Sequence, residues 1–169
     1  MALTREKKEA VVGELEQLLA GSKLTVIAHY QGTSVKSMQQ LRNHAIQEHT
    51  VLRVTKNRLF KKALAGSELL KDIDTTKIRG QLLYAFNADD EVAPARNLAD
   101  FAKTNPQIDF VAGITAEGEL LDAAAVKVLS SLPTKDVLRA QLLGTIGAPV
   151  SGFVRVLSGN LRGFLNVLS

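Results

Sequence analysis

The sequence predicts an α/β fold: a sandwich in which a mixed sheet of about four strands is flanked by helices, followed by an extended C-terminal helix. Hydrophobic residues make up 46% of the chain, which is enough to form a core. Segments with helical and strand-like periodicity alternate up to Pro133. Beyond Pro133 a single helical stripe continues without strand signals. We therefore expect two domains, a globular domain at residues 1–133 and a helical domain at residues 134–169.

The first half of the globular domain alternates between helices and strands. Apolar residues at intervals of three and four predict helices, whereas runs of β-branched and aromatic residues predict strands. Thr4 and Ser34 can cap the first two helices with their hydroxyl groups. The expected order is helix 4–19, strand 24–30, helix 34–46, strand 51–55 and helix 58–66.

The second half continues the same alternation. Three acidic residues at 89–91 and Pro94 mark the start of a helix that ends near Phe101. Glu117 and Gly118 suit the turn of a hairpin. Asp122 can cap the last helix of the domain, which ends where Pro133 removes a backbone donor. The expected order is strand 80–86, helix 89–101, strand 108–114 and helix 122–132.

The C-terminal segment repeats a short apolar sequence. Residues 152–158 return as residues 163–169, eleven positions later, and residues 142–147 form a weaker copy. Eleven residues are close to three helical turns, so the copies stack on one face of a helix. Pro149 should kink or divide this helix, and Gly159 should fray it. The expected partner-binding residues are Leu143, Ile146, Val150, Phe153, Val154, Leu157, Leu161, Phe164, Leu165 and Leu168.

The apolar stripe of this helix is also compatible with two alternative roles. The helix could fold back onto the globular domain, or it could lie on a membrane surface. A membrane-spanning helix is disfavoured because Arg139, Arg155 and Arg162 interrupt the apolar segment. A membrane-surface helix is disfavoured because the repeats contain only two basic residues, Arg155 and Arg162, and the chain has no tryptophan. The charged N-terminus lacks the apolar segment of a secretory signal, so we expect a cytoplasmic protein with no membrane partner.

Positive charge gathers in the first half of the chain. Residues 23–62 carry eight basic side chains and one acidic residue, Glu48. Such a segment is typical of a phosphate-binding surface, although an ordinary solvated helix face has the same composition. The scarcity of aromatic residues disfavours base stacking on a sheet face and favours recognition of a folded RNA through shape and phosphates. The expected RNA-binding residues are Gly32, Lys36, Arg42, Lys56, Asn57, Arg58, Lys61 and Lys62.

Catalytic chemistry finds little support in the sequence. The chain has no cysteine, no phosphate-binding Gly-Lys-Ser/Thr loop and no Gly-x-Ser-x-Gly motif. Its histidines are His29, His44 and His49, and the last two are five residues apart, on different sides of a helix. We therefore expect a protein that is not an enzyme and holds no cofactor or metal.

Several motifs together resemble a known family. They are Gly32 after the first strand, Leu41-Arg42 in the next helix, the string from Val54 to Gly66, the segment from Phe101 to Lys103, and Leu132-Pro133. In combination they resemble the bacterial stalk-base proteins of the large ribosomal subunit, relatives of the acidic stalk protein P-zero. Gly32, Arg42, Lys56, Asn57, Lys61 and Lys62 match positions of the family pattern. Gln31 and Gln81 depart from it, because the family often has arginine and proline there.

The resemblance implies a structural constituent of the large ribosomal subunit. It implies that the globular domain docks on the GTPase-associated region of ribosomal RNA beside another ribosomal protein. It further implies that the C-terminal helix binds two or three dimers of the acidic stalk protein, which recruit translational GTPases. The alternative is a free RNA- or protein-binding regulatory module whose C-terminal helix folds back.

Overall fold

The computed structural model describes the backbone of residues 4–66 and 78–168, and the side chains of residues 4–66 and 78–160. The chain forms two compact units, Met1–Leu132 and Pro133–Ser169. The first unit contains strands and helices, and the second contains one long helix.

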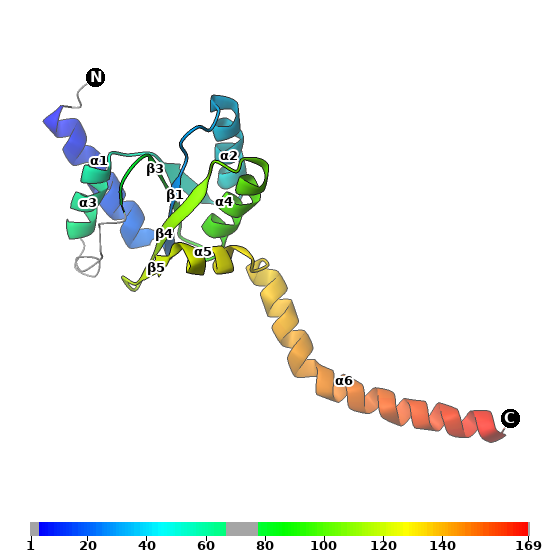
Figure 1. Ribbon diagram of the computed structural model, residues 1–169. Coiled ribbons are helices and arrows are strands. Elements are labelled where there is room, and N and C mark those ends of the chain that lie inside the picture. The colour runs from blue at the N-terminus through cyan, green and yellow to red at the C-terminus, as the bar shows by residue number, and fades with distance from the viewer. Residues whose placement is uncertain (1–3, 67–77, 169) are drawn as a thin grey trace. The chain divides into compact units, whose positions relative to one another are not determined.

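The first unit is built on a five-stranded sheet with the strand order β2-β3-β1-β4-β5 (Figure 1). Neighbouring strands are antiparallel in every pair. The predicted α/β fold is thereby confirmed. The strands are β1 (Leu24–His29), β2 (Thr50–Arg53), β3 (Leu82–Asn87), β4 (Asp109–Thr115) and β5 (Leu120–Asp122).

The sheet differs from the prediction in two details: it is wholly antiparallel rather than mixed, and it has five strands rather than about four. The strands β1 and β2 run in the same direction but lie on either side of β3, and β3 and β4 likewise lie on either side of β1. The connection from β1 to β2 thus passes over β3, and the connection from β3 to β4 passes over β1. This is the split arrangement of ferredoxin-like sheets. The fifth strand, β5, has only three residues, too few for alternation to reveal it.

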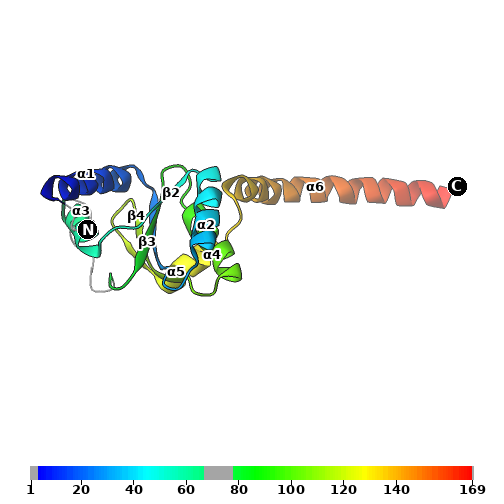
Figure 2. The ribbon, with the colours of Figure 1, turned by 90° about the horizontal axis from the view of Figure 1, so that it is seen from above.

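Helices cover both faces of the sheet (Figure 2). One core cluster joins α1 and α3 to the sheet, and the other joins α2, α4 and α5 to the opposite face. Because both faces are covered, β1 and β3 are buried almost throughout and consist of nearly continuous apolar runs. The helices are α1 (Arg5–Gly21), α2 (Val35–Gln47), α3 (Asn57–Gly66), α4 (Ala93–Thr104) and α5 (Ala123–Ser130).

The predicted helix caps have different outcomes. Ser34 caps α2 as expected, because the backbone amide of Ser37 donates a hydrogen bond to its Oγ at 3.1 Å. Thr4 occupies the cap position of α1, but its side chain makes no capping bond there. Its carbonyl instead accepts the first helical hydrogen bond from Lys8.

The second unit consists of α6 (Lys135–Leu168), a helix of 34 residues. The helix continues through Pro149 and Gly159, so the predicted fraying at Gly159 does not occur, and of the two outcomes predicted at Pro149 the helix shows a bend rather than a division (Figure 1). Figure 1 shows the helix bending in its first half. Proline lacks the amide that would bond the carbonyl four residues earlier, and such a gap bends a helix without ending it.

Replacing Gly113 with alanine should destabilise the first unit. A Cβ atom at this position in β4 would lie 2.9 Å from Cγ2 of the fully buried Val126. Overpacking of this kind costs about 1–3 kcal/mol in the free energy of unfolding, which urea denaturation measures. The matched control is Gly13→Ala in α1, where a Cβ meets nothing within 4 Å. That variant should gain about 1 kcal/mol from helix propensity, and equal effects at both sites would contradict the packing described here.

Candidate nucleic-acid and partner-binding sites

A hollow of about 1000 Å³ opens at one end of the sheet. The register pairs His29 with Leu82 and Arg53 with Tyr84, so β1 and β2 end where β3 begins. The hollow is lined by α1, by the residue that follows β1, by the connection from β2 to α3, by the first half of α3 and by the approach to β3, and we call it the basic groove. Its lining residues include four cations and no acid; the cations are Lys8, Lys56, Arg58 and Lys62.

The basic groove gathers half of the predicted RNA-binding residues: Lys56, Asn57, Arg58 and Lys62 line it. Gly32 lies at the same end of the sheet, in the loop after β1, and Lys36 follows in the first turn of α2. Lys61 belongs to α3 but does not line the groove. Arg42 lies farther along α2, which covers the opposite face of the sheet from α3. RNA contact by these residues stays a prediction.

The charge of the groove is uncompensated within the part of the chain that the structure describes. Lys8, Lys56, Arg58 and Lys62 make no ion pair with the described residues, whereas Arg53 pairs with Glu14. Lysines and arginines that lack a carboxylate partner keep their full field toward solvent. The groove therefore attracts a polyanion, and the attraction should weaken as salt increases.

Asn57 braces the wall of the basic groove. Its Nδ2 donates a hydrogen bond to the Gly80 carbonyl at 3.0 Å, and its Oδ1 accepts one from the Tyr84 hydroxyl at 3.3 Å. Burial raises the pKa of Tyr84 well above its usual range, so the hydroxyl stays protonated and donates. The Tyr84 ring stacks on Phe60 of α3 with 4.0 Å between centroids. Asn57 thus joins the start of α3 to the segment that leads into β3.

Gly80 lets the chain turn sharply at the edge of the groove. Its φ is +86°, a left-handed conformation that favours glycine. A Cβ there would also lie 3.1 Å from Cε1 of His29. The His29 ring holds the same turn through a 3.2 Å hydrogen bond between its Nδ1 and the Gln81 carbonyl.

Sequence patterns do not reveal several residues of the groove. Lys8 lies in α1, far from Lys56 in the sequence and among neighbours of both charges, so no local charge signal could identify it. The strand pattern places Tyr30 only at the end of a strand. Gln81 stands out only as a departure from the family pattern. These three residues come together because β1, β3 and α1 meet at this end of the sheet. Local periodicity carries no information about such a tertiary arrangement.

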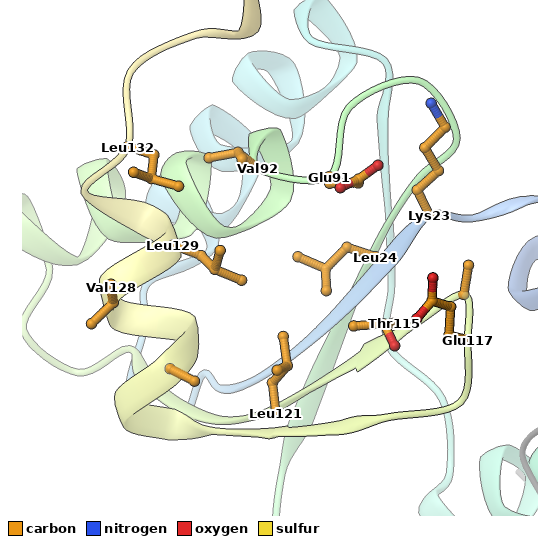
Figure 3. A pocket seen from close by; sticks show the side chains of 12 residues that line it. Lys23, Leu24, Glu91, Val92, Thr115, Glu117, Leu121, Val128, Leu129 and Leu132 are labelled. Atoms are coloured by element: carbon orange, nitrogen blue, oxygen red, sulfur yellow. The ribbon is translucent and has the colours of Figure 1, made fainter. Parts of the chain in front are cut away.

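A second hollow, of about 900 Å³, lies at the other end of the sheet. Leu24 at the start of β1 pairs with Thr115 at the end of β4, which places this hollow away from the basic groove. Leu24, Leu121 and Leu129 converge on it, whereas Lys23 and Glu91 lie at its edge (Figure 3). Its chemistry is mainly apolar and unsuited to phosphates. No group of three or more metal-ligating side chains occurs among the described residues.

The apolar face of α6 is largely exposed. In the described part of its unit α6 is the only helix or strand, so the unit offers no second element for packing. At about 100° per residue the predicted partner-binding positions fall on one side of the helix. The side chains of Leu161, Phe164, Leu165 and Leu168 lie outside the described side chains. The other predicted positions are 48–70% exposed: Leu143, Ile146, Val150, Phe153, Val154 and Leu157.

The segment Lys135–Asn160 is long and apolar enough to cross a membrane, by length and composition alone. Its uncharged run is residues 140–154, between Arg139 and Arg155, and is shorter than the roughly 20 residues that a bilayer requires. Length and composition are weak evidence, because a helix that binds protein partners through an apolar face passes the same test.

Comparison with known proteins matches both units of the chain. The family described as Ribosomal protein L10 matches residues 3–103, and the Ribosomal protein uL10 C-terminal region matches residues 132–158. The protein named large ribosomal subunit protein uL10 from Cupriavidus necator is 42% identical over 158 residues, covering 94% of this chain and 89% of that protein. The protein of the same name from Ralstonia nicotianae is 41% identical, covering 94% of this chain and 92% of its own length.

These matches define the class of the protein. It is a structural, non-enzymatic protein of the large ribosomal subunit, and its place is on the ribosome in the cytoplasm. Within this class the chain belongs to the uL10 family. The family resemblance predicted from the sequence motifs is thus confirmed.

Replacing Asn57 with alanine should destabilise the first unit by about 1–3 kcal/mol. The change leaves the Gly80 carbonyl and the Tyr84 hydroxyl without their partner, and Tyr84 is fully buried. Urea denaturation measures the loss. The neighbouring exposed cation provides the control, because Lys56→Ala should change stability by no more than about 0.5 kcal/mol. Similar losses in both variants would rule out the bracing role of Asn57.

Proposed function

We propose that this protein forms the base of the ribosomal stalk. The first unit binds the GTPase-associated region of the large-subunit ribosomal RNA, beside a neighbouring ribosomal protein. The helix α6 carries two or three dimers of the acidic stalk protein, and these dimers recruit translational GTPases. The observation that carries the proposal is the apolar sequence of α6, which repeats at an interval of eleven residues and whose described side chains are exposed.

The repeat supports several copies of one partner. Phe153, Val154 and Leu157 recur as Phe164, Leu165 and Leu168, so a helix pair that fits the first set also fits the second. An amphipathic helix docking into an apolar groove is a common recognition mode. Burying each of these side chains contributes about 1.5–3 kcal/mol, so a few anchors suffice for stable binding. The weaker copy at residues 142–147 allows a third dimer.

The basic groove supports RNA binding by the first unit. Four cations with no acid among the lining residues suit the phosphates of a folded RNA. Lys8 comes from α1, Lys56 directly precedes α3, and Arg58 and Lys62 belong to α3; α1 and α3 pack in the same core cluster. Phosphate contacts of this kind position a protein on its RNA. The proposal therefore assigns anchoring to the first unit and recruitment to α6.

The double variant Lys56→Glu with Lys62→Glu should weaken binding to RNA of the GTPase-associated region. Removing two phosphate contacts should also lower the slope of log affinity against log salt by about one unit per contact. Filter binding or fluorescence anisotropy at several salt concentrations measures both quantities.

The matched control for this charge reversal is Lys103→Glu with Lys127→Glu. These exposed lysines lie on α4 and α5, on the opposite face of the sheet, and the change in net charge is the same. The control should keep most of the affinity. Equal losses in both double variants would indicate attraction by net charge and would remove the basic groove from the proposal.

Phe153→Asp and Phe164→Asp should each remove one stalk-protein dimer, because each introduces a charge into one copy of the repeat. Native mass spectrometry of the complex counts the dimers directly. Gln141→Asp is the control, because it adds the same charge on the side of α6 away from the repeat. Unchanged stoichiometry in both phenylalanine variants, with α6 protected from proteolysis in the isolated chain, would favour the folded-back regulatory module instead.

A further inference from the structure

We propose that the basic groove holds one unpaired base of the bound RNA, in addition to contacting phosphates. This inference rests on the RNA binding proposed above and assigns a particular ligand to the groove: a nucleotide whose base has left the RNA stack. The base would enter the groove, and its phosphates would remain at the cations.

The groove has an apolar floor that phosphate binding does not explain. Val11, Val54, Leu59 and Leu82 line it together with the ring of Tyr30. Val54 is 41% exposed, whereas Leu59 and Leu82 are buried. Hydrated phosphates gain nothing from an apolar surface, but the flat face of a base gains free energy when it leaves water for such a surface. The floor therefore favours a ligand with both an anionic and an aromatic part.

The size of the groove suits a single nucleotide. Pockets that hold small ligands have volumes of about 300–1000 Å³, and the basic groove is at the upper end of this range. Its charge also distinguishes between possible occupants, because four cations without an acidic neighbour favour a polyanion over a neutral peptide.

The wall of the groove contains a polar side chain that the edge of a base can meet. Gln81 lines the groove, and its side-chain amide can both donate and accept. Thr55 belongs to the lining as well, but its Oγ1 atom is shielded from solvent, so an entering base does not reach that atom directly.

The position of the groove reconciles base binding with the few aromatic residues of the chain. Single-strand readers stack several bases on an open sheet face, whereas helices cover both faces of this sheet. The end of the sheet is different, because Tyr30 follows β1 directly and lines the hollow there. One ring is sufficient when one base is bound.

The test combines a variant that fills the groove with removal of single bases from the RNA. In the full-length protein, Val54→Phe occupies the groove without changing any charge. The RNA of the GTPase-associated region is prepared with each unpaired nucleotide replaced in turn by an abasic one, which keeps the phosphate. Val51→Phe is the matched control, because Val51 is also 41% exposed but does not line the groove.

One abasic position should reduce the affinity of the unmodified protein about tenfold, the lower range for one stacked base. Val54→Phe should bind the intact RNA about tenfold more weakly, with an unchanged salt slope, and the same abasic position should have no further effect. Val51→Phe should behave like the unmodified protein. If urea denaturation shows that Val54→Phe is unfolded, Val11→Phe fills the groove from the side of α1.

Two results would overturn the inference while leaving the RNA-binding proposal intact. In the first, the groove-filling variant binds the intact RNA as tightly as the unmodified protein. In the second, the losses from the variant and from every abasic position are additive, which means that they act at separate places. Failure of the unmodified protein to bind this RNA at all would overturn the RNA-binding proposal, and this inference with it.

Discussion

The covering of both sheet faces by helices is the constraint on which the rest of the first unit depends. The two split crossovers place β1 and β3 in the centre, with α1 and α3 on one side and α2, α4 and α5 on the other. No sheet face remains for a ligand. The ends of the strands and the helix surfaces are the places left for binding once the two sheet faces are covered, together with the sheet edges at β2 and β5. The basic groove lies at one end of the sheet and is lined by cations, whereas the hollow at the other end is mainly apolar.

Much of the fold could be predicted from the sequence, because local patterns determine local structure. The Ser34 cap and the apolar period of α2 lie within a few residues of one another, and the apolar run of β3 is continuous. The antiparallel order could not be predicted in this way. The strand order depends on which strand inserts between the two strands joined by each crossover. That pairing is determined by packing between residues distant in sequence, such as Ile27 of β1 and Tyr84 of β3. The three-residue β5 was too short to produce a pattern.

The candidate site was predictable where its residues are close in sequence. Lys56, Arg58 and Lys62 stand in one basic segment, and the structure places all three at the basic groove. Charge density alone overestimates such a site, because Arg53 of the same segment is paired with Glu14. It also misses Lys8, whose charge is balanced by its neighbours in sequence but not by its neighbours in space. Asn57 was predicted to bind RNA, and its side-chain amide also holds the groove wall through hydrogen bonds to Gly80 and Tyr84. A local sequence pattern does not reveal this structural role.

The composition of α6 indicates how its stability is obtained. The helix contains Gly144, Gly147, Gly152 and Gly159, and a Cβ at any of them would meet nothing within 4 Å. Each glycine weakens a helix by about 1 kcal/mol relative to alanine, and Pro149 removes a backbone hydrogen bond as well. Intrinsic propensity therefore cannot hold 34 residues helical, and the described part of its unit contains no second element against which α6 could pack. Packing supplies most of the stability of such helices, so the partner binding proposed above would stabilise α6 by burying its apolar face. Under that proposal, the helical order of α6 and the binding of its partner are thermodynamically coupled.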